Sequence, residues 1–392
     1  MAKNSKRKLL SITVFLSLLL ISSAYATLVP NVHAAEITVQ QKGLTILNDV
    51  IGLDVEKYDT VSKEGPQDSY LGVVPQENVR YTLESTGSKI DALYTFTNGK
   101  LRMIHVLESE GTPRLTKSAT KPVQLGNKTV QVIDVPETAK VFLNDYQRYS
   151  GNSFYGDLAS MLEHVDAKEN LTKTSGNVKL EMTDSGGSTT FKWTYTFNGI
   201  DAPSKCVALG YKDGFLKYFI DNWDLYKIGS TTVNLSEQEA VDIAMERART
   251  FSWNMSSDND TVKITNFKVT NAMIWENVFC SNLYADQPRS EDPLMLYPVR
   301  HVWVSLDKFY PGNVYGIEVY LWADTKDVAY IQERFSTLDP PVDLVATSDD
   351  YTVQPLSGQS VNEIESLLVN NLGYVPSICR DHARSYPSLV FA

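Results

Sequence analysis

Hydrophobic positions follow two periods along this chain, and the pattern changes from helical to strand-like spacing several times. A helical stripe over 44–51 is followed by strand-like alternation over 79–83. Two further β-rich runs, 92–96 and 101–106, are joined by Asn98-Gly99, the dipeptide most typical of a tight hairpin. The first part of the chain therefore predicts a helix followed by antiparallel strands.

The same succession returns in the second part of the chain. Helical stripes over 139–146 and 158–165 precede strand patterns over 178–182, 191–197, 206–211 and 215–220. The last two are joined by Asp213-Gly214, which predicts another hairpin. Four aromatic residues alternate within 191–197, which places them on one face of a strand. Such a set of large side chains on one face predicts core.

A third succession begins with Ser236 and Glu239, which have the spacing of a capping box at a helix start. The strand patterns that follow cover 262–269, 299–306, 314–322 and 328–335. Between them, Glu276–Pro298 predicts a long loop, and loops of this length are often functional. A further capped helix is expected over 360–372.

Helices that alternate with hairpin-linked strands predict an α+β fold. We expect repeated helix-plus-antiparallel-sheet units after an N-terminal signal or anchor segment. With 392 residues, the chain is long enough for two or three domains. The expected division is a signal peptide or signal-anchor over 1–34, α+β units over 36–130, 134–230 and 234–336, and a linker with a C-terminal helix over 337–392.

The N-terminus has the three parts of a secretory signal. Basic residues up to Lys8 precede the uncharged, leucine-rich run Leu9–Ile21, and small-residue sites end at Ala26 and Ala34. The uncharged run continues to Val29 and is long enough to cross a bilayer, so cleavage and an uncleaved anchor are both open. In either case we expect the rest of the chain outside the cytoplasm, secreted or held at the outer face of the membrane.

The chain is acidic, with a formal charge of −11, and loss of the four basic residues of the N-terminal segment would leave −15. So acidic a surface repels nucleic acid and anionic lipid, so we expect neither as a partner. No second apolar run of spanning length follows, and membrane contact is expected only through an uncleaved N-terminal segment.

Cysteines and glycosylation sequons give further expectations for an exported chain. The three cysteines allow at most one intramolecular disulfide, for which we expect Cys206–Cys280. Burial of all three as small apolar side chains is the alternative. Five Asn-x-Ser/Thr sequons predict N-glycosylation if the host glycosylates: Asn127, Asn170, Asn234, Asn254 and Asn259.

No local string that could carry chemistry is complete. Asp184-Ser185-Gly186-Gly187 resembles the nucleophile region of chymotrypsin-like proteases, but no histidine stands in a matching context, and a hairpin turn is expected. Asp258-Asn259-Asp260 lacks the glycine and glutamate that complete a calcium loop. The histidines, His301 among them, have no zinc-ligand spacing. We therefore expect no catalytic, cofactor-binding or metal-binding residue, and no cofactor.

The third succession resembles the PepSY module, an α+β domain found in propeptides of secreted peptidases and in cell-envelope proteins. Residues 235–244 are similar to the family's Ser-x-x-x-Ala-x-x-x-Ala helix opening, and 297–306 with 317–325 are similar to its paired strands. Lys326 stands where the family usually has a glycine. The resemblance covers 234–336 and brings no catalytic residue. It implies inhibition or chaperoning of a peptidase, or binding at the envelope.

Export, repeated modules and incomplete catalytic motifs together predict a non-enzymatic envelope or extracellular protein. We expect it to bind or regulate a protein or peptide, such as a peptidase, through its sheets and the Glu276–Pro298 loop. Two alternatives stay open. One is an extracellular hydrolase whose site is assembled from distant residues, and the other is a structural surface-layer or adhesin element.

Overall fold

The computed structural model describes residues 37–65, 68–117, 119–125, 128–165, 170–257, 260–286, 288–338 and 340–355. The predicted signal or anchor segment and the helix expected over 360–372 lie outside these ranges. Within them, no helix has both the length and the apolar character needed to span a bilayer.

Helices are few and mostly short. The α-helices are α2 (Val39–Thr45), α3 (Val135–Ser150), α4 (Phe154–Ser160) and α5 (Glu237–Thr250), and α2 continues as a π-helical turn, Ile46–Val50. Short 3-10 turns cover Val55–Lys57, Asn282–Tyr284, Val342–Leu344 and Ser348–Asp350. The predicted capping box is confirmed, because Ser236 accepts from the Glu239 N–H and Glu239 accepts from the Ser236 N–H.

Thirteen of the described strands precede α5, and the expected hairpin turns are confirmed. Asn98 and Gly99, and likewise Asp213 and Gly214, have the positive φ angles that a tight hairpin needs. The strands are β1 (Asp59–Glu64), β2 (Asp68–Tyr70), β3 (Val74–Ser85), β4 (Ser88–Thr97), β5 (Lys100–Gly111), β6 (Thr120–Leu125), β7 (Lys128–Ile133), β8 (Leu171–Ser175), β9 (Val178–Ser185), β10 (Ser188–Phe197), β11 (Ile200–Lys212), β12 (Phe215–Asp221) and β13 (Lys227–Ile228).

The last third adds β14 (Trp253–Ser257), β15 (Asp260–Thr265), β16 (Val269–Ser281), β17 (Met295–Tyr310), β18 (Val314–Trp322), β19 (Val328–Phe335) and β20 (Thr352–Pro355). The bounds of β18 and β19 match the prediction. The predicted loop Glu276–Pro298 is wrong at both ends, because β16 continues through Ser281 and β17 begins at Met295. A bulge after Ile274 interrupts the alternation of β16, which hid the rest of the strand in the sequence.

The expectation of repeated helix-plus-antiparallel-sheet units is wrong. Fifteen strands form one mixed sheet, with the main order β1-β3-β4-β5-β12-β11-β16-β17-β18-β19. The hairpins are antiparallel as expected, but β5 also pairs with β12, and β11 pairs in parallel with β16 at Asp201 and Val278. An open strand edge presents unpaired backbone groups. The pairings of β5 with β12 and of β11 with β16 satisfy such groups, and they join strands from different predicted units.

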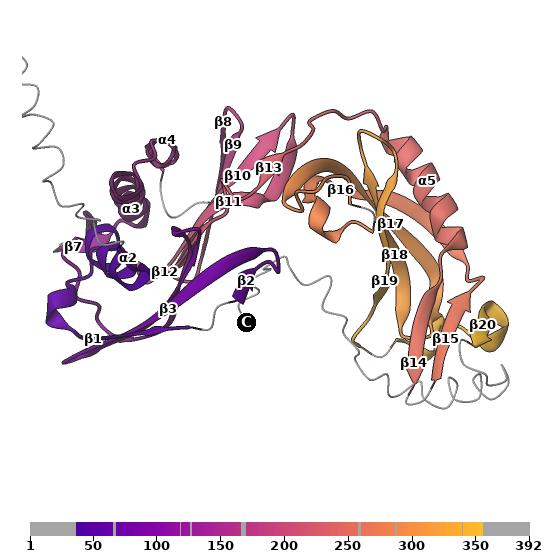
Figure 1. Cartoon of the computed structure of the whole chain (residues 1–392), viewed down its shortest axis with the longest axis horizontal. Helices are drawn as coiled ribbons and strands as arrows, with labels where there is room; N and C mark the ends of the chain where they lie inside the picture. The colour runs from indigo at the N-terminus through magenta and orange to yellow at the C-terminus, as the bar shows by residue number, and fades with distance from the viewer. Residues whose placement is uncertain are drawn as a thin grey trace, which may run out of the picture.

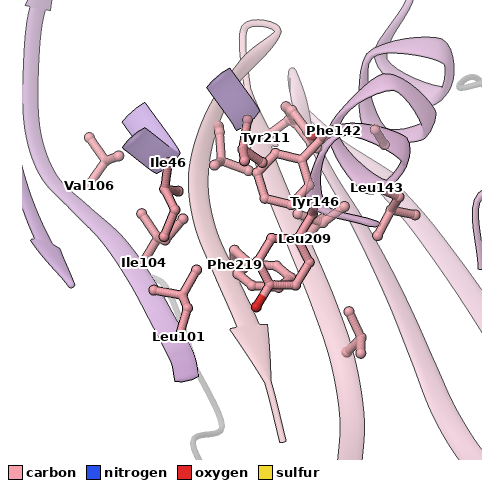
Figure 2. Packing of buried hydrophobic residues seen from close by; sticks show 14 of the residues in the cluster. Ile46, Leu101, Ile104, Val106, Phe142, Leu143, Tyr146, Leu209, Tyr211 and Phe219 are labelled. Carbon is pink, nitrogen blue, oxygen red and sulfur yellow. The ribbon is translucent and has the colours of Figure 1, made fainter. Parts of the chain in front are cut away.

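The molecule forms an arch with two limbs (Figure 1). We call β1–β12 with α2, α3 and α4 the N-terminal limb, and β14–β20 with α5 the C-terminal limb. In the N-terminal limb one core joins Ile46 of the π-turn, Leu143 of α3 and Phe219 of β12 (Figure 2). Residues from both of the first two predicted units therefore share a single core.

The C-terminal limb has a separate core beneath α5. Ala240, Ala244 and Ala248 form the buried stripe of this helix. They pack on apolar side chains of the sheet, including Val304 and Ile317. Alanine side chains are small and let the helix lie close to the strands. In Figure 1, α5 lies on the outer side of the arch, so the opposite face of β16–β19 turns inward.

Candidate functional site

The face of β16–β19 opposite α5 carries an unbroken row of aromatic rings. Successive side chains of a strand point to opposite faces. Val302 and Val319, which pair across β17 and β18, face α5, so His301 and Tyr320 face the other way. We call this surface the aromatic face; its members are Trp275, His301, Trp303, Phe309, Tyr315, Tyr320 and Tyr330.

Each ring of the aromatic face contacts the next. The distances between the centroids of consecutive rings are 6.1 Å for Tyr330–Tyr320, 4.1 Å for Tyr320–His301, 6.4 Å for His301–Trp275, 5.8 Å for Trp275–Trp303, 5.4 Å for Trp303–Tyr315 and 5.7 Å for Tyr315–Phe309. Apart from the closer His301–Tyr320 stack, these separations lie in the range of favourable ring pairs. The row therefore crosses four neighbouring strands without a break between rings, with the buried, polar His301 as one of its members.

Two local features shape this surface. Plain alternation from Ile274 puts Trp275 on the same side as His301, where Trp275 is 60% exposed, and the bulge between Ile274 and Glu276 brings Glu276 onto that side as well. Gly316 gives the Trp303 indole room, since a Cβ atom at Gly316 would come within 2.2 Å of Trp303 Cζ2. Met273, opposite Trp303 in the register, is 49% exposed and extends the apolar area.

A charged cluster is centred on His301, which is itself one of the rings. His301, 3% exposed, stacks on Tyr320 with an interplanar angle of 11°. Its Nδ1 is 3.3 Å from Glu276 Oε1, and its Nε2 is 3.5 Å from Glu318 Oε1. Glu318 also contacts Arg334 Nε at 2.8 Å and accepts from Gln332 Nε2 at 2.7 Å. The cluster holds two cationic and two acidic groups within the apolar row.

The surroundings fix the charge states of this cluster. Burial would lower the pKa of His301, but the carboxylates of Glu276 and Glu318 outweigh it and raise that pKa above its ordinary value. Burial would raise the pKa of Glu318, but His301 and Arg334 lower it to about 2. At neutral pH Glu318 is therefore ionised, and His301 keeps its proton to higher pH than an exposed histidine.

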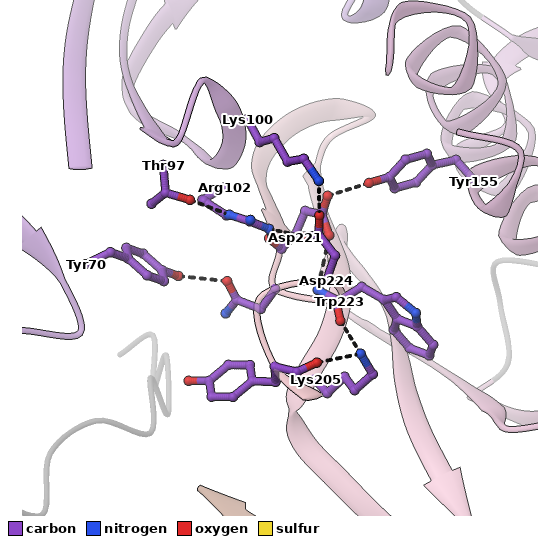
Figure 3. A network of polar contacts seen from close by, with 11 residues as sticks. Tyr70, Thr97, Lys100, Arg102, Tyr155, Lys205, Asp221, Trp223 and Asp224 are labelled. Atoms are coloured by element: carbon purple, nitrogen blue, oxygen red, sulfur yellow. Dashed lines mark hydrogen bonds and ion pairs between the residues drawn. The ribbon is translucent and has the colours of Figure 1, made fainter. Parts of the chain in front are cut away.

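A second polar network lies at the junction of β5 and β12 (Figure 3). The Tyr155 hydroxyl donates to the buried carboxyl of Asp221, whose pKa is raised by burial. Arg102 donates to the Thr97 hydroxyl at 2.7 Å and to the Asp221 carbonyl oxygen at 3.1 Å. Arg102 and Lys100 also contact Asp224. These bonds tie together strands from distant parts of the sequence, which gives the network a structural role.

The long segment predicted to contact a partner is a shorter connection that is tied to the sheet. The buried amide of Asn282 donates to the Ser290 carbonyl oxygen at 2.8 Å and accepts from the Arg289 N–H at 2.6 Å. Arg289 binds Asp324 through two nitrogens, at 2.8 and 3.0 Å, and lies 4.1 Å from the Tyr297 ring centroid. The connection between β16 and β17 is therefore anchored beside the aromatic face.

The structure does not join Cys206 and Cys280 in a disulfide bond. Cys206 is buried and burial raises its thiol pKa to about 11, as the alternative of a small apolar side chain implies. Cys280 lies on β16, close to Val278, which pairs with Asp201 of β11. A bulge in β11 between Ala202 and Cys206 separates Cys206 from that pairing. Cys379 lies outside the described residues.

Of the five predicted glycosylation sites, Asn127 and Asn259 lie outside the described residues. Asn170, Asn234 and Asn254 are exposed. The side-chain amide of Asn234 donates to the Asp324 carbonyl oxygen at 2.9 Å, and the Asn170 oxygen accepts from the Asp184 N–H at 3.0 Å. Asp184–Gly187 forms the turn between β9 and β10, as expected. In the described ranges no three His, Cys, Asp or Glu side chains are grouped to hold a metal ion.

Sequence reasoning missed the aromatic face. Glu276 was the first residue of a predicted loop, Trp275 lay in no predicted element, and His301 had no partner at a recognisable spacing. The available signal was the alternation of His301 and Trp303 along one strand with Glu318 and Tyr320 along the next. That pattern puts polar and aromatic residues on the face that α5 does not cover.

Comparison with known proteins adds little to this description. No protein-family model matches the chain, and no curated protein matches it. Among solved structures, the Bacillus megaterium YpeB C-terminal domain is similar over 77% of this chain and 99% of its own, with 9% sequence identity and a TM-score of 0.29. A TM-score this low does not establish a shared fold, so the similarity carries no argument about function.

Proposed function

We propose that this chain is an exported binding protein that contacts a protein or peptide partner through the aromatic face. The observation that carries the proposal is the row of seven contacting rings, with Trp275 60% exposed. Tyr, Trp, Phe, Met and Arg are enriched at protein interfaces. All five types meet on this face: Tyr315, Trp275, Phe309, Met273 and Arg334.

The charged cluster favours binding over catalysis. A general acid or base works best with a pKa near the operating pH. Glu318, with its pKa lowered to about 2, is a weak base and holds no proton to donate at neutral pH, and both ring nitrogens of His301 face carboxylates of the cluster itself. Held between rings, these charges suit the orientation of a partner's polar groups. We therefore propose a non-enzymatic role, with regulation of a peptidase, as the PepSY resemblance implies, as its candidate form.

Site-specific photo-crosslinking in the exporting host tests this proposal. A photoreactive residue placed at Trp275 is expected to give a discrete protein adduct. The same residue at Val61, an equally exposed position on β1 of the other limb, serves as the control. The adduct formed at 275 should disappear when Trp303→Ala is added. Identical adducts from both positions, or a glycan in place of a protein at 275, would contradict the proposal.

A further inference from the structure

A second site lies in the N-terminal limb, far from the aromatic face. A cavity of about 320 Å³ opens among four segments: the end of the π-turn, the stretch before β6, α3 and the β11–β12 hairpin. Its walls are mainly apolar, with Val50, Leu115, Val141, Phe142 and Leu216 among them. Ligand pockets in proteins begin at roughly this volume and have this apolar character. Phe142, which is labelled in Figure 2 among the buried side chains, is one of the lining residues.

The cavity lining includes one cationic side chain, Lys117. Lys117 Nζ donates to the Asp49 carbonyl oxygen and to Asp145 Oδ2, each at 2.6 Å. An ammonium group has three donors, so the described residues accept two of the three. The buried Asp145 carboxylate is shared with Arg148, which leaves one carboxylate between two cations. The Asp49 carboxylate is exposed and offsets part of this positive charge.

Two further features separate this cavity from a simple packing gap. The buried hydroxyl of Tyr211, a lining residue, has no hydrogen-bond partner within the described part of the chain. An unsatisfied buried polar group is costly and calls for an explanation. In addition, Val50 is the last residue of the π-helical turn, and such turns are rare and often occur at functional sites.

We propose that this cavity binds an amphipathic monocarboxylate, with the apolar chain inside and the carboxylate on Lys117. At about 30 Å³ for each non-hydrogen atom, the cavity holds about ten such atoms, which corresponds to a chain of about eight carbons. The apolar wall accounts for the tail, and the remaining donor of Lys117 accounts for the head group. The site is independent of the partner proposed for the aromatic face.

Calorimetric titration of the exported chain with octanoate, below the concentration at which octanoate forms micelles, tests the site. Octanoate is expected to bind more tightly than octan-1-ol, which lacks the charge, and more tightly than butanoate, which lacks the tail. Lys117→Gln should weaken octanoate binding about tenfold, as expected for the loss of one charge-assisted hydrogen bond. Lys121→Gln is the matched control, because Lys121 pairs with Asp134 on neighbouring elements and does not line the cavity.

A cavity-filling substitution gives an independent readout. Val141→Phe should abolish octanoate binding while it leaves the thermal unfolding midpoint near that of the unaltered chain. If that variant fails to fold, Thr138→Met fills the same space from the same helix. An absence of octanoate binding to the unaltered chain would overturn the proposal. Equal affinity in Lys117→Gln, or in a folded cavity-filled variant, would also overturn it.

Discussion

In the N-terminal limb Trp193 and Phe219 are fully buried, whereas in the C-terminal limb Trp275 is 60% exposed and Tyr315 is 39% exposed. Both limbs place aromatic residues at alternate positions of long strands. What differs is the cover. Three helices and a hydrophobic cluster enclose the rings of the first limb, while α5 covers only one face of the second. The same strand pattern therefore gives a core in one place and a surface in the other.

The largest expected difference between the limbs is in the stability lost when one aromatic ring is removed from each. Trp193→Ala leaves a cavity in the shared core and should lower the free energy of unfolding by about 3–5 kcal/mol. Trp275→Ala removes an exposed side chain and should change that free energy by less than about 0.5 kcal/mol. Urea titration followed by circular dichroism measures both. Similar losses in the two variants would show that the aromatic face is structural rather than open for a partner.

The charged cluster of the C-terminal limb should appear in the acid dependence of stability. The folded-state pKa of Glu318 is about 2, below the ordinary pKa of 4.5, so its contribution to stability is present above pH 4.5 and is lost as pH falls toward 2. The full loss should be roughly 3–4 kcal/mol, since the two pKa values differ by about 2.5 and one pKa unit is worth about 1.4 kcal/mol. Urea unfolding at several pH values should show this slope in the unaltered chain and not in Glu318→Gln. Equal slopes would mean that the cluster does not hold Glu318 ionised.

Much of the local structure could be predicted from the sequence, and the arrangement of the elements could not. The capping box of Ser236 and Glu239 and the Asn98-Gly99 turn depend only on residues a few positions apart, so the local sequence was sufficient to predict them. The pairing of Asp201 with Val278 joins positions 77 residues apart, and no local pattern encodes it. The aromatic face was missed for the same reason, because it depends on which sheet face α5 covers. The sequence pattern also did not show the bulge in β16 that puts Glu276 on the same face as Trp275.

The attachment of α5 gives a smaller effect that bears on the same comparison. Ser236→Ala removes the side chain that accepts from the Glu239 N–H at the start of this helix. Loss of such a cap should cost about 1 kcal/mol. Because α5 is the α-helix that covers the C-terminal core, the loss should concentrate there. Hydrogen exchange should be faster in β17 and β18 and unchanged in β10 and β11. Equal acceleration in both limbs would show that they unfold as one unit.

The buried carboxyl of the N-terminal limb should respond to pH with the opposite sign to Glu318, and with the smallest effect. Burial raises the folded-state pKa of Asp221 above its ordinary value of 3.8, while hydrogen bonds from Tyr155 and the Trp223 N–H and the charge of Arg102 oppose that rise. The unfolded chain then releases this proton first, so stability falls as pH rises from 3.8 through the folded-state pKa. The difference in unfolding free energy between the unaltered chain and Asp221→Asn should decrease over that range and then become constant. A difference that grows with pH would mean that folding lowers the pKa of Asp221, as it does that of Glu318, and would contradict this contrast between the limbs.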